Sequence, residues 1–360
     1  MLFLLLHTLL VLGVGGRILL RDDLNPDARM AWLATIIVLP YLGCVLYLLF
    51  GEVTVGRYVL RREQRTADFM AARLAGHPAA REVLGDAADT ARMIAPAWLP
   101  AFGYAASING VHPVPGNHGE LMANGAAARE RMLADMDAAE REINVLYYIW
   151  LNDETGTRTA HALMRAAQRG VTCRAMVDGL GSRAFIHSPL WRQMREAGVQ
   201  TAIALPFGNL LKVLLTSRID LRNHRKITLI DGSITYVGSQ NCADEAFRVK
   251  AKYAPWVDVM LRVRGRVVSQ MQWLFASDWM QTTGQSFDPF QPLAAPVADG
   301  FPAVVTAMGP TERPLATPQL LSVLIAAARS ELTISTPYFV PDATVLEACA
   351  PPPGAACGSP

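Results

Sequence analysis

Two long apolar stretches at the amino terminus constrain the fold of this chain more than any other feature. Residues 1–20 are nearly all apolar apart from His7 and Arg17, and residues 30–50 contain no ionisable side chain except tyrosine and cysteine. A mean hydropathy of +0.21 is high for a chain with 18% charged residues, and these stretches account for the excess. Because a helix needs roughly 20 apolar residues to cross a bilayer, we predict two transmembrane helices within residues 1–55.

A cleaved signal peptide is the alternative interpretation of the first stretch. Residues 1–6 carry no Lys or Arg, and residues 13–16 form only a weak cleavage site, so we favour an uncleaved helical hairpin. Pro40 in the second stretch is compatible with a kinked membrane helix. Slightly more arginines follow the second stretch than lie between the two, which favours a cytoplasmic main body.

Charge and cysteine content constrain the class of protein only weakly. The formal net charge of +2 is far from the strongly basic balance of a dedicated nucleic-acid-binding protein and by itself argues neither for nor against nucleic acid. Together with the apolar hairpin, this modest charge leads us to expect no nucleic acid partner. The five cysteines show neither the paired spacing of a metal site nor a disulfide framework, which fits a reducing compartment.

After the hairpin, the sequence predicts a linker segment and then an α/β domain. In residues 56–105, arginines mixed with apolar residues predict a basic amphipathic helix that could gather anionic lipid, with a solvated linker helix as the alternative. In residues 106–285, a helical stretch precedes a strand-like run over 143–150, a helix over 158–168 and a buried strand over 171–178. This alternation predicts a sheet covered by helices, so the expected fold class is α/β.

The start of a second α/β half is expected after a second linker. Residues 286–316 are rich in Pro and Ala with weak periodicity, which is typical of a linker. Residues 331–334 repeat the pattern of residues 142–145, each after an alanine-rich helix, and positions 142 and 331 lie 189 residues apart. Duplication of one unit explains this echo most simply, and chance similarity is the alternative. We therefore predict that residues 317–347 begin the second half.

A short polar motif carries the candidate chemistry. His224 and Lys226 are two residues apart, so on an extended chain their side chains leave by the same face. An ammonium can stabilise charge developing on a phosphodiester oxygen, and an imidazole beside it can attack phosphorus. Asp231, followed by glycine and a second apolar run, predicts a β-hairpin that brings Ser239 and Asn241 toward the same phosphate.

Each of these residues also has a purely structural interpretation. His224 and Lys226 could be a solvated pair on an edge strand, Asp231 a turn residue, and Ser239 and Asn241 ordinary caps at a strand end. The combination at this spacing is harder to explain structurally than any single member. It therefore favours a phosphate-handling site.

The whole pattern resembles the signature of the phospholipase D superfamily. His224-x-Lys226-x-x-x-x-Asp231 followed by Gly238-Ser239-x-Asn241 carries that resemblance, and the flanking Arg222, Asn223 and Arg225 are similar to the cardiolipin synthase version. Other stretches resemble family landmarks in the right order, namely Asn117, Asn124-Gly125, Tyr148-Ile149-Trp150, Asp153, Gly156, Val177-Asp178-Gly179, Gly181-Ser182 and Thr336-Pro337-Tyr338-Phe339. The resemblance covers roughly residues 1–347 and includes the amino-terminal hairpin.

The resemblance implies a phosphatidyltransferase of the bacterial inner membrane. Two phosphatidylglycerols would be joined into cardiolipin plus glycerol through a phosphatidyl-histidine, and attack by water instead would make a phospholipase D-type hydrolase. It implies His224 as nucleophile, an orienting role for Asp231, and contacts to phosphate from Lys226, Ser239 and Asn241. The implied partners are phosphatidylglycerol, other anionic phospholipids and the membrane, with no metal and no organic cofactor.

The carboxy-terminal end departs from the family pattern. The 189-residue offset puts a partner histidine at about position 413, and no second His-x-Lys follows Asp231. Residues 348–360 are an aberrant, proline-rich tail that cannot continue a helix, so a frameshift or premature stop is the favoured hypothesis and natural shortening the alternative. We expect impaired activity unless a homodimer or a separate chain completes the site. A catalytically inactive membrane-bound lipid- or partner-binding remnant is the alternative, and the apolar hairpin disfavours a nuclease.

Overall fold

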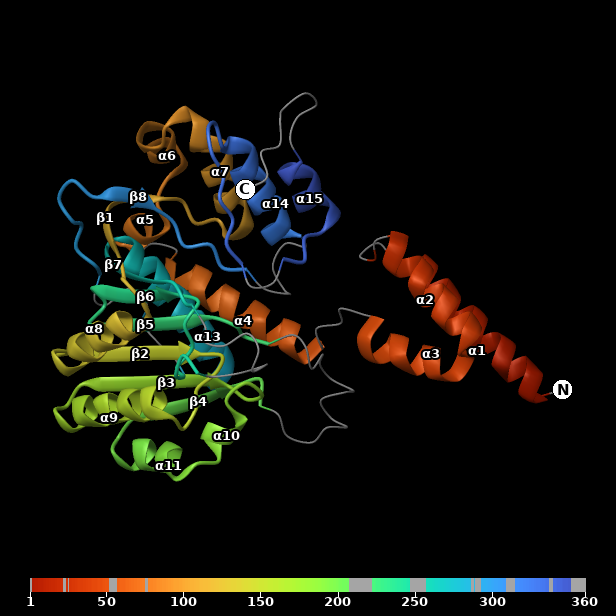
Figure 1. Ribbon diagram of the computed structural model, residues 1–360, viewed down its shortest axis with the longest axis horizontal. Helices are drawn as coiled ribbons and strands as arrows, with labels where there is room; N and C mark the ends of the chain where they lie inside the picture. Colours follow the sequence, from red (N-terminus) through yellow and green to blue (C-terminus); the bar gives the residue numbers. More distant parts are fainter. Residues whose placement is uncertain are drawn as a thin grey trace. The chain divides into compact units, whose positions relative to one another are not determined.

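The computed structural model describes most of the chain, namely residues 2–21, 24, 26–51, 57–74, 77–206, 222–246, 257–285, 288, 293–308, 315–336 and 339–350. These residues belong to two compact units (Figure 1). One contains the amino-terminal helices up to residue 60, and the other contains the described residues from 61 onward.

The amino-terminal unit is a set of helices packed through apolar side chains. It consists, in chain order, of α1 (Leu2–Leu19), α2 (Pro26–Val38), α3 (Pro40–Leu46) and a π-helical turn (Tyr47–Gly51). Its buried core is formed by Ile18, Ile36, Cys44 and Tyr47. Gly43 lets α3 approach α2 closely, because a Cβ there would lie 2.8 Å from the carbonyl oxygen of Thr35.

The prediction of two membrane-spanning helices needs correction. Across the part of the chain that the structure describes, no helix combines the length and the apolar character needed to cross a membrane. The second apolar stretch is divided where α2 ends at Val38 and α3 begins at Pro40. Leu39 between them has φ −129° and ψ 72°, because the proline ring disfavours helical backbone at the residue before it. Two short helices and a π-helical turn therefore replace the expected continuous span.

The second unit is built around one mixed sheet of eight strands, in the order β4-β3-β2-β5-β6-β7-β1-β8. The strands are β1 (Val114–Leu121), β2 (Glu142–Tyr147), β3 (Thr172–Asp178), β4 (Gln200–Ala204), β5 (Lys226–Ile230), β6 (Ile234–Gly238), β7 (Met260–Gly265) and β8 (Phe301–Ala303). β2, β3 and β4 are parallel, and every other pairing is antiparallel. The predicted strands at 143–150 and 171–178 are β2 and β3, although β2 ends at Tyr147.

Helices cover both faces of this sheet (Figure 1). One face carries α8 (Gly125–Asp137), α9 (Glu154–Gln168), α10 (Arg183–Ile186) and α11 (Pro189–Glu196). The other carries α13 (Val267–Thr283) and the carboxy-terminal part of α4 (Arg57–Leu74). The central strands are apolar on both faces, as expected for a sheet buried between two helical layers. The α/β fold class is thereby confirmed.

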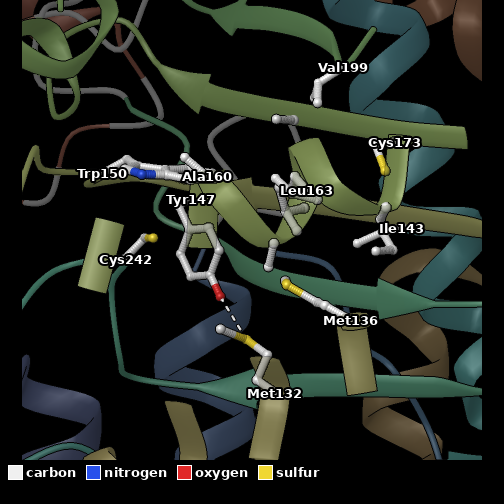
Figure 2. Close-up of a cluster of buried hydrophobic side chains, with 14 of the residues drawn as sticks. Met132, Met136, Ile143, Tyr147, Trp150, Ala160, Leu163, Cys173, Val199 and Cys242 are labelled. Carbon is white, nitrogen blue, oxygen red and sulfur yellow. Dashed lines mark hydrogen bonds between the residues drawn. The ribbon is translucent and has the colours of Figure 1, made fainter. Parts of the chain in front are cut away.

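The core between the sheet and helices α8 to α11 consists of apolar side chains around the buried hydroxyl group of Tyr147 (Figure 2). Met136, Ile143 and Leu163 are fully buried there. The Tyr147 hydroxyl lies 2.8 Å from Thr228 Oγ1 and 3.5 Å from Met132 Sδ, so its polar atom has partners inside the core. Burial without charge compensation raises the pKa of Tyr147.

Three of the residues that resemble family landmarks stabilise the fold, two by capping helices and one by connecting strands. Asn124 Oδ1 accepts the Ala127 N–H at the start of α8, and Asp153 Oδ1 accepts the Gly156 N–H at the start of α9. Asn117, fully buried in β1, donates from Nδ2 to the carbonyl oxygen of Phe301 in β8 at 3.0 Å. These side chains position elements of the fold.

The remaining helices flank the sheet. They are α5 (Ala80–Leu84), α6 (Ala87–Met93), a 3-10 turn (Pro96–Trp98), α7 (Leu99–Asn109), α14 (Ala316–Ala327) and α15 (Ala343–Cys349). The edge strand β8 lies inside the segment predicted as a linker. The strand-like run at 331–334 is irregular instead of extended in a sheet, and Leu332 and Ile334 are 48% and 49% exposed.

The predicted division into two halves stays a prediction. No described strand pairs with residues 331–334, which explains their irregular backbone. Pro337, Tyr338 and residues 351–360 of the predicted tail lie outside the described residues.

Candidate functional site

Two guanidinium–carboxylate pairs hold the segment that leads into β5. Arg222 Nη2 lies 2.9 Å from Asp178 Oδ1, with side chains only 5% and 0% exposed. Arg225 Nη1 lies 2.7 Å from Asp278 Oδ1. Burial raises the pKa of Asp278, and the Arg225 charge opposes that shift. The two pairs fix the backbone before and after His224, whose own side chain is exposed.

The hydrogen bond of His224 defines which ring nitrogen is open. Its Nδ1 lies 3.1 Å from the carbonyl oxygen of Arg222. A carbonyl only accepts, so Nδ1 carries the proton in this contact and Nε2 of the neutral ring keeps its lone pair. The Tyr148 ring lies against the imidazole, with centroids 4.0 Å apart and planes inclined at 35°.

Lys226 lies beside His224. Its Nζ donates to the carbonyl oxygen of His224 at 2.7 Å and is 5.8 Å from the centroid of the Tyr148 ring. Burial lowers the pKa of the Lys226 ammonium, and the nearby Asp258 carboxylate opposes this shift. Two of the predicted residues therefore meet, with Tyr148 as a shared neighbour that sequence reasoning did not assign to the site.

Ser239 is tied to an aspartate rather than left open for a ligand. Its hydroxyl donates to Asp258 Oδ1 at 2.7 Å and accepts the Val259 N–H at 3.0 Å. Asp258 also acts electrostatically on Lys226, so Ser239 and Lys226 share this carboxylate. The structure brings Asp258 here, because the antiparallel pairing of Gly238 with Met260 places the residues just outside both strands side by side.

Asn241 contacts the loop that carries Tyr148. Its Oδ1 accepts the Ile149 N–H at 3.2 Å, which leaves Nδ2 as the group able to donate to a ligand. The contacts from Asn241 to Ile149, and from the neighbouring Tyr148 to His224, connect the predicted amide with the predicted histidine. This connection runs through the backbone of one short loop.

Asp231 is separated from these residues. It follows β5 at the end opposite Lys226, and five residues of strand span roughly 16 Å. Its carboxylate accepts the N–H groups of residues 140, 141 and 142 at 3.0, 2.8 and 3.0 Å. The turn itself forms as predicted, with positive φ at Asp231 (51°) and Gly232 (61°). The geometry therefore gives Asp231 a structural role at the start of β2 rather than contact with the other site residues.

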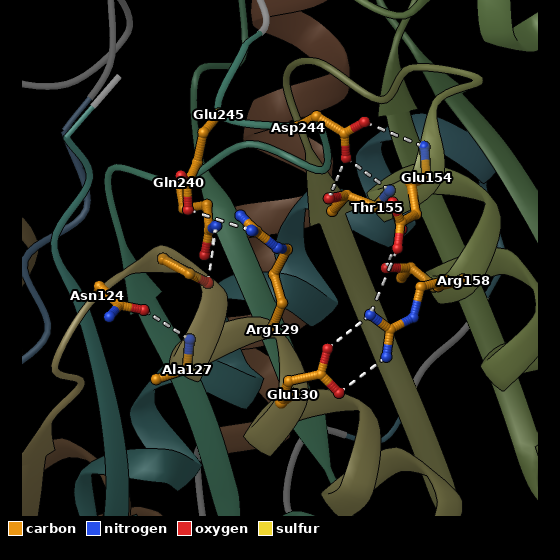
Figure 3. A network of polar contacts seen from close by, with 12 residues as sticks. Asn124, Ala127, Arg129, Glu130, Glu154, Thr155, Arg158, Gln240, Asp244 and Glu245 are labelled. Carbon is orange, nitrogen blue, oxygen red and sulfur yellow. Dashed lines mark hydrogen bonds and ion pairs between the residues drawn. The ribbon is translucent and has the colours of Figure 1, made fainter. Parts of the chain in front are cut away.

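A polar hollow of about 330 Å³ lies elsewhere, between α8, α9 and the loop after β6 (Figure 3). Its charges are paired with one another. Arg158 makes two hydrogen bonds to Glu130 at 2.6 and 2.8 Å, and Arg129 Nη2 lies 3.1 Å from Glu245 Oε1. None of the five predicted site residues lines it. Among the described residues, no cluster of three or more His, Cys, Asp or Glu side chains could hold a metal ion.

The family models and the sequence relatives that match this chain agree on one family. The family described as "Cardiolipin synthase, PLD-like domain" matches residues 132–279, and the one described as "Phospholipase D-nuclease N-terminal" matches residues 10–52. Cardiolipin synthase A of Edwardsiella ictaluri (strain 93-146) is 36% identical over 347 residues, which cover 95% of this chain and 70% of that protein. The proteins of the same name from Serratia proteamaculans (strain 568) and Escherichia coli O157:H7 are 35% and 34% identical, with the same coverage.

Solved structures resemble the chain only weakly. The phospholipase D family member Nuc from Salmonella typhimurium matches with a TM-score of 0.33 and 16% identity, over 46% of this chain and 96% of Nuc. This likeness adds nothing to the sequence relationship.

Proposed function

The chain belongs to the bacterial cardiolipin synthases of the phospholipase D superfamily, a family of phosphatidyltransferases, and on that premise we propose that it joins two phosphatidylglycerols into cardiolipin plus glycerol. The observation that carries the proposal is the arrangement of His224. Its Nδ1 faces a backbone carbonyl and its Nε2 is the nitrogen left to react, with the Lys226 ammonium adjacent.

The proposed first step is a displacement at phosphorus. The Nε2 lone pair of His224 forms the N–P bond while the bond from phosphorus to the glycerol oxygen breaks, and that oxygen leaves with a proton as glycerol. Lys226, together with Asn241 Nδ2, would donate to the non-bridging oxygens as their charge grows. In the second step a hydroxyl of another phosphatidylglycerol loses its proton and attacks phosphorus, and the N–P bond breaks.

The departing glycerol oxygen needs a proton donor. General acid assistance of this kind is typically worth about 10² to 10⁴-fold in rate. None of the other six histidines of this sequence is followed by lysine at the His224–Lys226 spacing. We propose that a second copy of the chain presents its own His224 as this donor.

A lipid substrate fits the surface of the amino-terminal unit. Leu12, Ile37 and Val38 are 66%, 72% and 74% exposed, and they belong to a larger set of exposed apolar side chains on α1, α2 and α3. Several exposed apolar side chains gathered on neighbouring helices are typical of a surface that contacts a membrane or another protein. The proposed location is the bacterial inner membrane, with the main body on the cytoplasmic side.

The test is turnover of labelled phosphatidylglycerol by the purified chain in detergent–lipid micelles. Wild type, His224→Ala and a matched His187→Ala control would be compared, because His187 is exposed and its one contact among the described residues is local, to the Arg183 carbonyl. We expect cardiolipin and glycerol from wild type and His187→Ala, and none from His224→Ala. Phosphatidic acid in place of cardiolipin would make water the acceptor and the chain a hydrolase. Absence of any product from wild type would refute the proposed activity.

The dependence of activity on protein concentration tests whether two copies of the chain form the site. If two copies form the site, activity per molecule should rise with chain concentration, and mixing with an excess of His224→Ala chains should suppress it. Activity proportional to concentration, unaffected by the mixed-in variant, would refute the paired site.

A further inference from the structure

The loop from Tyr148 to Leu151, which connects β2 to α9, is held from two sides. The Ser182 hydroxyl donates to the carbonyl oxygen of Tyr148 at 3.0 Å and accepts the Trp150 N–H at 2.9 Å. On the other side, Cys242 exchanges backbone hydrogen bonds with Ile149 and Leu151, both 3.1 Å long. The backbone that carries Tyr148 is therefore fixed before any ligand binds.

A glycine gives the Tyr148 ring its room. A Cβ at Gly181 would lie 2.4 Å from the carbonyl oxygen of Tyr148 and 2.9 Å from its ring carbon Cε2. Any side chain at this position would force the loop or the ring to move. The fold thus directs this partly buried aromatic ring toward the segment that enters β5.

The imidazole of His224 needs such a neighbour. Its side chain is exposed, and its one described hydrogen bond runs from Nδ1 to the Arg222 carbonyl. A single hydrogen bond leaves an exposed ring free to rotate to other rotamers, at the cost of that bond alone. The Tyr148 ring, 4.0 Å away, closes off one side of the imidazole.

The same ring lies near the cation. Lys226 Nζ is 5.8 Å from the Tyr148 centroid, within the range in which an aromatic face attracts an ammonium. One side chain thus contacts the nucleophile and faces the phosphate-binding cation. No other described aromatic ring has both of these contacts.

We propose that Tyr148 is a positioning residue, which holds the imidazole of His224 with Nδ1 on the Arg222 carbonyl and Nε2 open, and which steadies the Lys226 ammonium beside it. For its effect on turnover this inference rests on the proposed function. For the ring orientation it rests only on the contacts of Tyr148. The aromatic face is the active part, so the hydroxyl is dispensable.

The test compares Tyr148→Phe, which keeps the face, with Tyr148→Leu, which removes it. The first readout is the tautomer of the His224 ring, measured by NMR on ¹⁵N-histidine-labelled protein at a pH above the titration range of histidine. The His224→Ala variant identifies which signal belongs to His224. We expect wild type and Tyr148→Phe to hold the proton on Nδ1, and Tyr148→Leu to show both tautomers. From the usual strength of aromatic pairs, the preference should fall about three- to tenfold.

The second readout is turnover of phosphatidylglycerol. Tyr148→Leu should lower kcat by about three- to tenfold with KM within about twofold, and Tyr148→Phe should restore it. If the wild type makes no product, the proposed function fails and the tautomer alone decides the role of Tyr148. An unchanged tautomer in Tyr148→Leu overturns the inference, as does a Phe variant as impaired as the Leu variant. A thermal melt of each variant separates these outcomes from unfolding.

Discussion

Replacement of Asp178 by Asn should destabilise the fold strongly, because the carboxylate is the buried counter-charge of Arg222. Asp178 Oδ1 accepts the N–H groups of Leu180 and Gly181 at 2.8 and 3.0 Å, as well as Arg222 Nε and Nη2 at 3.0 and 2.9 Å. Asparagine can keep the bonds to Oδ1, but it carries no charge, and its Nδ2 would face Arg222 Nε, which donates to Asp178 Oδ2 at 3.1 Å. A positive charge only 5% exposed would then lose its partner, which typically costs about 3–5 kcal/mol.

Asp137→Asn provides a matched control. Asp137 Oδ1 also binds one arginine through two nitrogens, Arg165 Nε and Nη2 at 3.0 and 2.8 Å, but these side chains are 45% and 51% exposed. Solvent screening should keep that loss below about 1 kcal/mol. The assay is urea unfolding followed by circular dichroism, with the free energies compared at equal slope. Equal effects of the two substitutions would refute the claim that burial makes the Asp178 pair important.

Three other predictions follow from the same structure. Asp231→Ala should cost about 2–4 kcal/mol, because three backbone N–H groups lose a charged acceptor, whereas kcat per folded molecule should stay within about twofold; a selective loss of kcat would mean a catalytic role. Burial lowers the pKa of the Lys226 ammonium, so as the pH is raised, activity should begin to fall before the pH at which an ordinary lysine loses its proton. Stability should rise over the same pH interval, since the unfolded chain then binds more protons than the folded chain. Lys226→Arg should move the alkaline limb of kcat to higher pH, and an unmoved limb would exclude Lys226 as its source. Burial raises the pKa of Cys173 to about 12 and also raises that of Cys242, so iodoacetamide should modify neither thiol in the native protein at neutral pH, as checked by mass spectrometry; rapid native labelling would contradict their burial.

Local patterns made part of the site predictable. Lys226 begins a strand and His224 stands two residues earlier, so one short segment carries both side chains. The turn at Asp231 and Gly232 was likewise visible, because positive φ at adjacent positions favours this dipeptide. The alternation of strands and helices from β2 to β3 predicted the α/β class for the same reason, since each period is set by neighbouring residues.

The sequence pattern predicted the wrong secondary structure at two places, one because of a single residue and the other for want of a neighbouring strand among the described residues. Hydropathy predicted one span over residues 30–50, but the backbone at Leu39 before Pro40 interrupts the helix. The run at 331–334 has a strand-like composition, yet no described strand pairs with it. Strand propensity depends on such partners more than on the residues themselves.

The sequence by itself predicted which residues are candidates for phosphoryl chemistry, because His224 and Lys226 are defined by side-chain type and a spacing of two. Only the tertiary structure decided their surroundings. Tyr148, Asp178 and Asp258 come from three other parts of the chain, and the sheet order brings them to the entrance of β5. The reason is physical: a local spacing is set by backbone geometry, whereas a contact between distant residues exists only after strand pairing and helix packing have fixed which segments meet.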